Sequence, residues 1–409
     1  MDAREQNRKA VFADQVVPMP TVRLKKQLTR LIKQGHAWIF SDAIENRGDL
    51  PPGVPVRVLT PRGDRPIASG LYDPEHPIRV RVCRTEPPWE LDHRWLASRL
   101  HLASTLRRGL TRTEKTTGYR LVNGEGDRLP GLIVDIYGDT AVVKLDGGAP
   151  EAFYDCSWLG DWLVTQVGVR RVVRRYRQRG RAGEVLCGMP WTAPVEFLEN
   201  GMRLTADCLQ GQKTGFFLDQ RDNRQAIAWV SSGRSVLNLF SYTGGFSVAA
   251  GMGGAKSVTS VDSASRAIAD AQRHWELNQL PSTNHEAIVA DCFEFLEKAA
   301  SRGRTWDLVV SDPPSFAPNQ RSRSAALAAY AKLAQLALQV TAPQGLLAVA
   351  SCSSHIGAAE FYQLHLDVLA KARRPATLLL QRDLPCDHPT PLAMPEMRYL
   401  KFLLFHLAS

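Results

Sequence analysis

The sequence predicts a multidomain α/β protein whose C-terminal half is a parallel β-sheet covered by helices. Beyond residue 195, apolar runs alternate with helical segments, and we expect strands at 236–239, 258–261, 287–289, 308–310 and 346–350. This alternation is typical of a sheet with helices on both faces. Nearer the N-terminus, apolar and polar residues alternate with period two between frequent turn residues, which indicates a β-rich region. A chain of 409 residues is too long for one core, so two or three domains are expected.

Four segments follow from these patterns. Residues 1–20 are polar and mixed, and we interpret them as an extension. Residues 21–90 form the small β-rich domain, with alternating runs at 54–59 and 78–82. Residues 91–195 are predicted to be a central α/β domain, with helical spacing of Trp95, Leu96, Leu100, Leu102 and Leu106, and a strand pair around 132–135 and 141–143. Residues 196–409 hold the parallel sheet.

Composition limits the classes of protein that the chain can represent. Hydrophobic residues make up 44% and charged residues 22%, as in globular proteins. No apolar run approaches the roughly 18 residues that span a bilayer, and the polar start lacks a signal peptide's apolar core. We therefore expect a cytoplasmic protein without a membrane partner. The seven cysteines are scattered and never spaced as Cys-x-x-Cys, so neither a disulfide framework nor a metal site is indicated.

The net charge of +10 is concentrated in two basic segments, which favours a polyanionic partner. The first, residues 21–34, has five basic residues and no acidic one. The second, residues 170–181, has seven arginines and no carboxylate, interrupted by Val172, Val173 and Tyr176. Such segments suit contacts with RNA phosphates, although solvated protein faces are the alternative. The predicted RNA contacts are Arg23, Lys25, Lys26, Arg174, Arg175 and Arg177.

A strand that runs through paired glycines into a helix, residues 235–250, predicts a nucleotide-binding crevice. Asp262 ends the next apolar run and suits a ribose diol at the carboxyl edge of a parallel sheet. The Gly-x-Gly-x-x-Gly phosphate fingerprint is missing, which argues against NAD or FAD and for a nucleoside without phosphates. S-adenosylmethionine fits that description, and an ordinary strand-to-helix turn is the alternative. Predicted cofactor contacts from the turn are Asn238, Phe240, Tyr242, Thr243 and Gly244.

The fourth strand of this series delivers Asp312-Pro313-Pro314-Ser315-Phe316 to the same edge. Two prolines stiffen the turn, so the Asp312 carboxylate is held where it can hydrogen-bond a base edge. Phe316 offers a ring on which a base can stack. A plain structural turn is the alternative reading of this segment.

Cys352 follows the fifth strand, within Ser351-Cys352-Ser353-Ser354. If the fourth and fifth strands are neighbours, their ends lie about 5 Å apart, and Asp312 and Cys352 flank one pocket. Methylating carbon 5 of cytosine requires a thiolate that first attacks carbon 6, because carbon 5 alone is a poor nucleophile. Amino-group methylation needs no thiol, and a buried cysteine is often only a small apolar residue. We favour Cys352 as the nucleophile.

Two further segments complete the predicted crevice. Asp291, after the third apolar run, is placed to accept from an adenine amino group, a role compatible with capping the helix that follows. The segment 213–222 combines aromatic rings with basic residues, as a methionine carboxylate and an adenine require.

Taken together, these segments resemble the bacterial 23S rRNA cytosine-5 methyltransferase family of RlmI type. The resemblance rests on 213–222, 237–250, 312–316, 351–354, Asp387-His388-Pro389 and residues 395–401. It implies an N-terminal PUA domain, a central α/β domain, a Rossmann-like class I methyltransferase domain and S-adenosylmethionine as the methyl donor. It also implies a 23S rRNA or large-subunit precursor substrate. Implied cofactor residues are Phe216, Gln220, Arg221, Asp262, Asp291 and Asp312, and Cys352 is the implied nucleophile.

The chain departs from the family pattern at three places. Pro343-Gln344-Gly345 replaces the usual Pro-Gly-Gly, the arginine run at 170–181 is unusually dense, and Cys386 lies beside the Asp-His-Pro turn. Cys386 is therefore a second candidate thiol. Two rival functions stay open: methylation of a purine nitrogen with Cys352 as a bystander, and an RNA-binding or assembly factor without catalysis. A dehydrogenase is a distant third. The sequence leaves a homodimer open.

Overall fold

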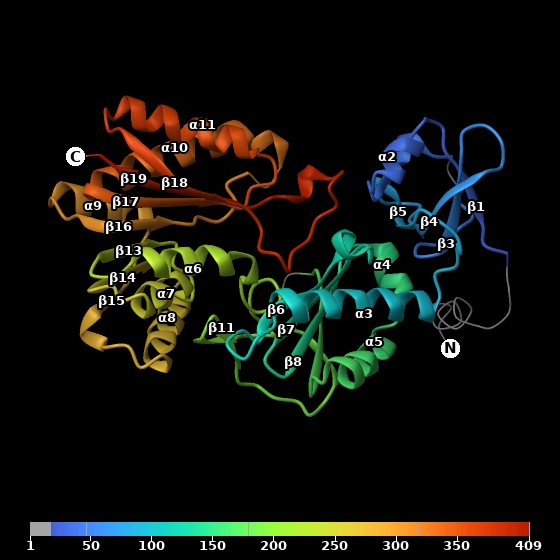
Figure 1. Ribbon diagram of the computed structural model, residues 1–409, viewed down its shortest axis with the longest axis horizontal. Coiled ribbons are helices and arrows are strands. Elements are labelled where there is room, and N and C mark those ends of the chain that lie inside the picture. The colour runs from blue at the N-terminus through green and yellow to red at the C-terminus, as the bar shows by residue number, and fades with distance from the viewer. Residues whose placement is uncertain (1–17, 46, 179, 318, 409) are drawn as a thin grey trace. The chain divides into compact units, whose positions relative to one another are not determined.

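The computed structural model describes residues 18–45, 47–178, 180–317 and 319–408 (Figure 1). Most of the predicted extension and Arg179 of the arginine run lie outside these residues. The chain divides into two compact units. Unit 1 comprises Met1–Leu198, Thr205–Leu218 and Cys386–Met397, and unit 2 comprises Glu199–Leu204, Asp219–Pro385 and Arg398–Ser409. The predicted boundaries near residues 20, 90 and 195 stay predictions.

The first sheet of unit 1 has five strands in the order β1-β3-β4-β5-β2. Their bounds are β1 Thr21–Arg23, β2 Trp38–Phe40, β3 Pro55–Leu59, β4 Pro66–Tyr72 and β5 Ile78–Arg84, with the short helix α2 at Thr29–Lys33. Val56, Val58 and Val80 are fully buried in its core. The period-two runs at 54–59 and 78–82 therefore fall on strands, as the alternation predicts.

The second sheet of unit 1 has the order β10-β9-β8-β7-β6. Its strands are β6 Gly118–Asn123, β7 Leu132–Tyr137, β8 Thr140–Leu145, β9 Arg171–Arg175 and β10 Glu184–Cys187. Helix α3 (His93–Leu110) packs beside it, followed later by α4 (Gly148–Phe153), α5 (Cys156–Trp162) and a π-helical turn, η3 (Leu163–Val167). Trp95, Leu96 and Leu100 of α3 are buried as its spacing suggests, whereas Leu102 and Leu106 are exposed.

A two-stranded sheet, β11 (Val195–Glu199) with β12 (Met202–Ala206), precedes the large sheet of unit 2. The large sheet has the order β15-β14-β13-β16-β17-β19-β18. Its strands are β13 Ser235–Leu239, β14 Ser257–Asp262, β15 His285–Val289, β16 Trp306–Ser311, β17 Thr341–Ser351, β18 Ala376–Arg382 and β19 Lys401–Leu407. Strand order reverses at β13, which pairs with β14 on one side and β16 on the other. Such a reversal opens a crevice at the carboxyl ends of the strands.

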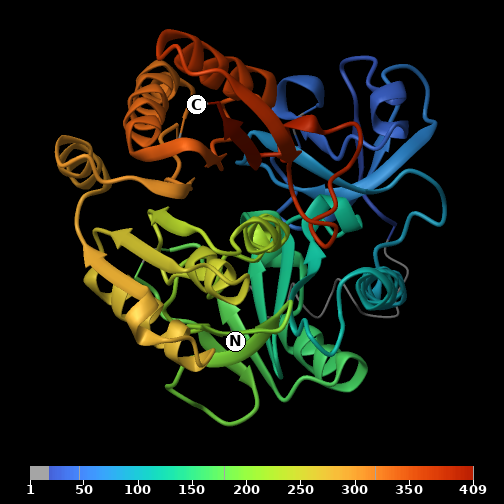
Figure 2. The ribbon, with the colours of Figure 1, turned by 60° about the vertical axis from the view of Figure 1, so that its left-hand side comes forward.

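Helices cover both faces of this sheet, as the alternation predicts. Figure 1 shows α6 (Arg221–Val230), α7 (Gly245–Met252) and α8 (Ser265–Leu277) on one face. Helices α9 (Cys292–Ser301), α10 (Arg323–Val340) and α11 (Ala358–Lys371) cover the other. Figure 2 shows the two helical layers from a second direction, with the sheet between them. Separate apolar cores lie on the two faces.

The five strands foreseen in the sequence, β13 to β17, pair in parallel, and two strands that the sequence analysis did not list, β18 and β19, extend the sheet at one edge. Strand β19 runs antiparallel to both β17 and β18. A parallel return requires a long crossover, usually a helix, and the segment between β18 and β19 contains only the short 3-10 turn η7 (Pro395–Met397). Among the residues that the structure describes, no helix is both long and apolar enough to cross a lipid bilayer.

Candidate functional site

The glycine turn between β13 and α7 holds three residues with left-handed backbone, at the reversal point of the sheet. Phe240, Tyr242 and Gly244 have φ of 53°, 46° and 76°. The Tyr242 backbone N–H donates to Oδ2 of Asp262 over 2.9 Å, and the Ala264 N–H donates to Oδ1 over 2.9 Å. Two backbone donors therefore orient the Asp262 carboxylate at the end of β14. A carboxylate has further lone pairs, which leaves it able to accept from a diol.

Three polar atoms beside this turn are buried and have no hydrogen-bond partner within the described part of the chain. They are Oδ1 of Asn238, Oγ of Ser241 and Oγ1 of Thr243. Leaving buried polar atoms unsatisfied is costly, so their grouping at one turn indicates a polar ligand. Gly244 lets helix α8 pack closely against the turn, because a Cβ at position 244 would lie 2.7 Å from Cβ of Ala271. The turn fits a nucleoside-bearing cofactor.

A buried polar chain fixes the Asn238 amide from below. Its Nδ2 donates to Oγ of Ser247 over 2.9 Å, which lies 2.6 Å from Oγ of Ser260, and that hydroxyl lies 2.8 Å from Nε2 of His285. Burial lowers the pKa of His285 to about 4, so the ring is neutral near pH 7. This series of hydrogen bonds uses the N–H of the Asn238 side chain. Its carbonyl oxygen, Oδ1, has no hydrogen-bond partner among the described residues.

Asp291 caps helix α9. Its Oδ1 accepts from the backbone N–H of Phe293 over 2.8 Å and of Glu294 over 3.1 Å. The Phe293 ring packs edge-on against Phe240, with centroids 6.3 Å apart. The capping role foreseen for Asp291 is therefore present, and its contact with adenine stays a prediction.

Asp312 follows the last residue of β16 and is held by a side-chain relay. Nε2 of Gln220 donates to its Oδ2 over 2.9 Å, and Nδ2 of Asn223 donates to Oε1 of Gln220 over 2.7 Å. Gln220 and Asn223 are buried at the start of α6, where Arg221 pairs with Asp222 at 3.2 Å. The relay joins two segments that the sequence analysis singled out separately, and it orients one oxygen of the Asp312 carboxylate.

Cys352 follows the last residue of β17, and β17 pairs directly with β16. Ser311 lies opposite Val349 in this register, so the strands that carry Asp312 and Cys352 are neighbours, as predicted. On the other side, Ser351 lies opposite Lys401 of β19. Both the pairing of β16 with β17 and the half-buried position of Cys352 agree with a place at the carboxyl edge of the sheet rather than in its core.

Lys401 is a buried cation beside the cysteine segment, and the sequence analysis gave it no role. Its Nζ donates to the carbonyl oxygens of Ser353 over 2.6 Å and of Tyr399 over 2.7 Å. Burial lowers the pKa of Lys401 to about 8, and the charge of Cys352 opposes this shift. The interaction is reciprocal, so a protonated Lys401 stabilises a thiolate at Cys352. Only the antiparallel pairing of β19 reveals this neighbour.

Hydroxyl groups tie the Asp312 turn to the Cys352 segment. Ser353 Oγ lies 3.0 Å from Oγ of Ser315 and 3.0 Å from the hydroxyl of Tyr330, to which Oγ of Ser351 donates over 2.9 Å. The Phe316 ring packs 4.9 Å from that of Tyr330. Tyr330 lies within α10 and belongs to no motif, so nothing in the sequence marked it.

Two residues of the earlier predictions belong to unit 1. Phe216 is buried, and its ring packs edge-on against Phe197 at 5.2 Å while its N–H donates to the Tyr137 hydroxyl over 3.2 Å. Its role as a cofactor contact stays a prediction. Cys386 is exposed and lies 3.5 Å from the hydroxyl of Thr111. Cys386 and Cys352 therefore belong to different compact units.

The tertiary structure supplies acidic partners that the basic segments lack in sequence. Arg23 pairs with Asp64 at 2.6 Å, and Lys26 pairs with Asp42 at 2.5 Å. In the arginine run, Arg177 lies 3.9 Å from Asp146. These are exposed pairs, which contribute little to stability and exchange readily for phosphate. Lys25 is exposed on the same segment as Lys26.

No group of three or more His, Cys, Asp and Glu side chains able to hold a metal ion occurs in the part of the chain that the structure describes. The carboxyl edge of unit 2 carries Asp262, Asp312 and Cys352, with Lys401 beside the Cys352 segment, together with the turn that fits a nucleoside.

Comparison with known proteins places these features in context. A family model described as S-adenosylmethionine-dependent methyltransferase matches residues 157–372, and one described as a PUA-like domain matches residues 22–85. The chain is 38% identical to a ribosomal RNA large subunit methyltransferase of Deinococcus radiodurans, over 95% of this chain and 98% of that protein. It is 35% identical to ribosomal RNA large subunit methyltransferase I of Aeromonas salmonicida, over 94% and 98%.

Solved structures agree. A methyltransferase complexed with SAH superposes with a TM-score of 0.82 at 25% identity, covering 95% of this chain and 100% of that one. A SAM-dependent methyltransferase from Streptococcus mutans superposes with a TM-score of 0.81 at 24% identity, over 95% and 100%. The second likeness supports the fold alone.

Proposed function

Because the chain belongs to the S-adenosylmethionine-dependent methyltransferase family that includes the ribosomal RNA large subunit methyltransferases, we propose that it methylates carbon 5 of a cytosine in 23S rRNA. S-adenosylmethionine is its methyl donor. The observation that carries the cytosine assignment is the pairing of β16 with β17, after which Asp312 and Cys352 follow in turn.

The proposed chemistry needs both side chains. The Cys352 thiolate adds to carbon 6 of the cytosine, which makes carbon 5 electron-rich enough to take the methyl group from the sulfonium. Asp312, in its protonated form, donates to ring nitrogen 3 and makes carbon 6 more electrophilic. Loss of the proton on carbon 5 and cleavage of the carbon–sulfur bond then release methylcytosine and the thiolate. Water or a group still to be identified takes the carbon 5 proton.

This chain's own residues set up the step. Gln220 orients Asp312, and Lys401 holds the backbone of Ser353 next to the nucleophile. Asp262 would accept from the ribose hydroxyls of the donor, and Asn238, Ser241 and Thr243 supply the unsatisfied polar atoms beside it. Phe316 is proposed as a stacking face for the RNA base, and the two basic segments as contacts to RNA phosphates. Such an enzyme would act in the cytoplasm, on 23S rRNA or a large-subunit precursor.

A covalent trap tests the proposal. A 23S rRNA fragment carrying 5-fluorocytidine should form a stable adduct with the native enzyme and with Cys386→Ala, because fluorine cannot leave carbon 5 as a proton does. Cys352→Ala should give no adduct and no methylcytosine. Full methylation by Cys352→Ala with a purine as the modified nucleoside would support nitrogen methylation instead. A trapped peptide containing Cys386 would transfer the nucleophile role to that thiol.

A further inference from the structure

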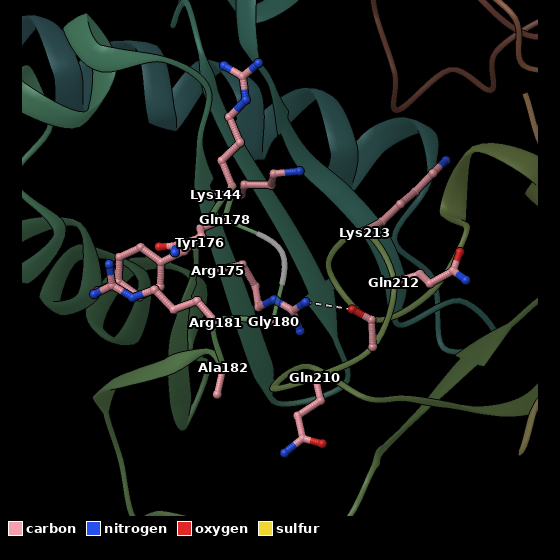
Figure 3. A pocket seen from close by; sticks show the side chains of 12 residues that line it. Lys144, Arg175, Tyr176, Gln178, Gly180, Arg181, Ala182, Gln210, Gln212 and Lys213 are labelled. Atoms are coloured by element: carbon pink, nitrogen blue, oxygen red, sulfur yellow. Dashed lines mark hydrogen bonds between the residues drawn. The ribbon is translucent and has the colours of Figure 1, made fainter. Parts of the chain in front are cut away.

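A basic cavity of about 940 Å³ lies within unit 1, apart from the residues assigned to methyl transfer (Figure 3). It is bounded by the end of β8, by the segment after β9 and by the loop 210–213. The lining side chains are Lys144, Arg175, Tyr176, Arg177, Gln178, Gly180, Arg181, Ala182, Gln210, Gly211, Gln212 and Lys213. The volume is larger than one phosphate or one nucleoside requires.

Cations predominate among the residues that line the cavity. Five of its described lining residues are Lys or Arg, and none is Asp or Glu. Burial lowers the pKa of Lys144, because desolvation disfavours the charged ammonium group, and the carboxylate of Asp146 opposes this shift. Asp146 approaches this group of charges, and it lies 3.9 Å from Arg177. Like charges at such proximity repel unless an anion joins them.

Arg175 organises the cavity wall rather than reaching into solvent. Its Nη2 donates to the carbonyl oxygen of Gly211 over 2.6 Å, drawn as a dashed line in Figure 3, and its Nη1 donates to that of Cys208 over 3.3 Å. Its Nε is buried without a hydrogen-bond partner in the described chain. Arg175 is thus a positioning residue that ties the loop 210–213 to β9.

Tyr176 holds two further guanidinium groups in place. Arg181 stacks on its ring at 3.4 Å from the centroid, as Figure 3 shows, and Arg174 lies at 4.8 Å. The Tyr176 hydroxyl donates to the Glu184 carboxylate, which anchors the ring to β10. Guanidinium groups fixed in this way lose less conformational entropy on binding an anion.

We infer that this cavity is a binding site for the sugar-phosphate backbone of the RNA substrate, with Lys144, Arg181 and Lys213 contacting phosphates. The inference rests on the proposed function for the identity of the polyanion. A chain of phosphodiesters carries several negative charges and can fill the volume, whereas a single phosphate is far smaller than the cavity. The side-chain amides of Gln210 and Gln212 at the rim supply donors and acceptors for ribose or base edges.

Salt-dependent binding of a 23S rRNA fragment to the full chain tests this site. In the triple variant Lys144→Gln/Arg181→Gln/Lys213→Gln, the slope of log affinity against log salt should fall by about 2–3, at roughly 0.7–0.9 for each lost phosphate contact. The matched control, Arg94→Gln/Arg108→Gln/Lys115→Gln, removes the same charge from exposed positions outside the cavity. Its slope should change by less than 1.

Three results would overturn the inference: an unchanged slope in the triple variant, an equal loss in the control, or adenosine monophosphate displacing RNA at equimolar concentration. The last would indicate a free-nucleotide site. Thermal unfolding midpoints, measured on the same preparations, should match between the two variants and show that both remain folded. The binding experiment does not involve methyl transfer. If the cavity binds RNA but the modified nucleoside is a purine, the proposed reaction is refuted and the binding site is not.

Discussion

The Gln220 amide donates a 2.9 Å hydrogen bond to Oδ2 of Asp312, across 92 residues of sequence. The amide is itself held by Asn223, so the Asp312 carboxylate has one oriented oxygen at the carboxyl edge of the sheet. Replacing this neutral donor with a carboxylate changes the electrostatics of Asp312 while leaving the shape of the side chain almost unaltered.

Gln220→Glu should lower the single-turnover rate of methyl transfer by about 10- to 100-fold at saturating S-adenosylmethionine, because the substitution removes the N–H donor that orients Oδ2 of Asp312. The matched control is Gln225→Glu on the same helix, which makes the same charge change and should retain near-native rates. Equal rates in the two variants would show that Gln220 does not position Asp312.

Asp262→Ala should weaken binding of S-adenosylhomocysteine by about 2–3 kcal/mol, since a charged acceptor for the ribose hydroxyls is lost. Isothermal titration calorimetry measures the change directly. Asp270→Ala on α8 removes a carboxylate that pairs with Arg273 and should leave the affinity unaltered. Unchanged affinity for S-adenosylhomocysteine in Asp262→Ala would show that Asp262 does not bind the cofactor.

Lys401→Met should slow covalent trapping of 5-fluorocytidine RNA more strongly at pH 7 than at pH 9. The pKa of Lys401 is about 8, so its charge supports a Cys352 thiolate below that pH and fades above it. The ratio of the trapping rate of the native enzyme to that of Lys401→Met should therefore decrease as pH rises through 8. Lys371→Met, at an exposed position, serves as the control. A loss of equal size at both pH values would mean that Lys401 acts only by holding backbone carbonyl oxygens.

His365→Leu should make unit 2 less sensitive to acid. Burial among Phe361 and Phe405 lowers the pKa of His365 from 6.5 to about 4, although its Nδ1–H donates to the Phe361 carbonyl oxygen. The His365 ring takes up a proton at a higher pH in the unfolded chain than in the folded chain. The free energy of unfolding therefore decreases as pH falls from 6.5 towards 4, by at most about 3 kcal/mol. Unfolding midpoints at pH 7 and 4.5 measure the effect. The control is His101→Leu, at an exposed position. Its unfolding midpoint should fall between pH 7 and 4.5 by as much as that of the native chain.

Local patterns were enough to predict most strands of the large sheet and the outline of its ligand edge. Buried parallel strands appear as short apolar runs, and side chains that follow such runs gather at one edge. This reasoning placed Asp262, Asp312 and Cys352 at the carboxyl ends of three strands of one sheet, with β16 and β17 as neighbours. The same reasoning did not reveal β19 or its antiparallel direction, because strand direction depends on how the chain returns and not on the strand's own residues.

What the sequence by itself determined was therefore the α/β class, the family resemblance and the residue types at the strand ends, since all of these depend on short-range periodicity and motifs. Only the tertiary structure decided which partners those residues meet. The Gln220–Asp312 bond, Lys401 beside the Cys352 segment, and the acidic partners of Arg23 and Lys26 join residues far apart in the chain. Such contacts depend on strand order and loop closure, and no local pattern encodes them.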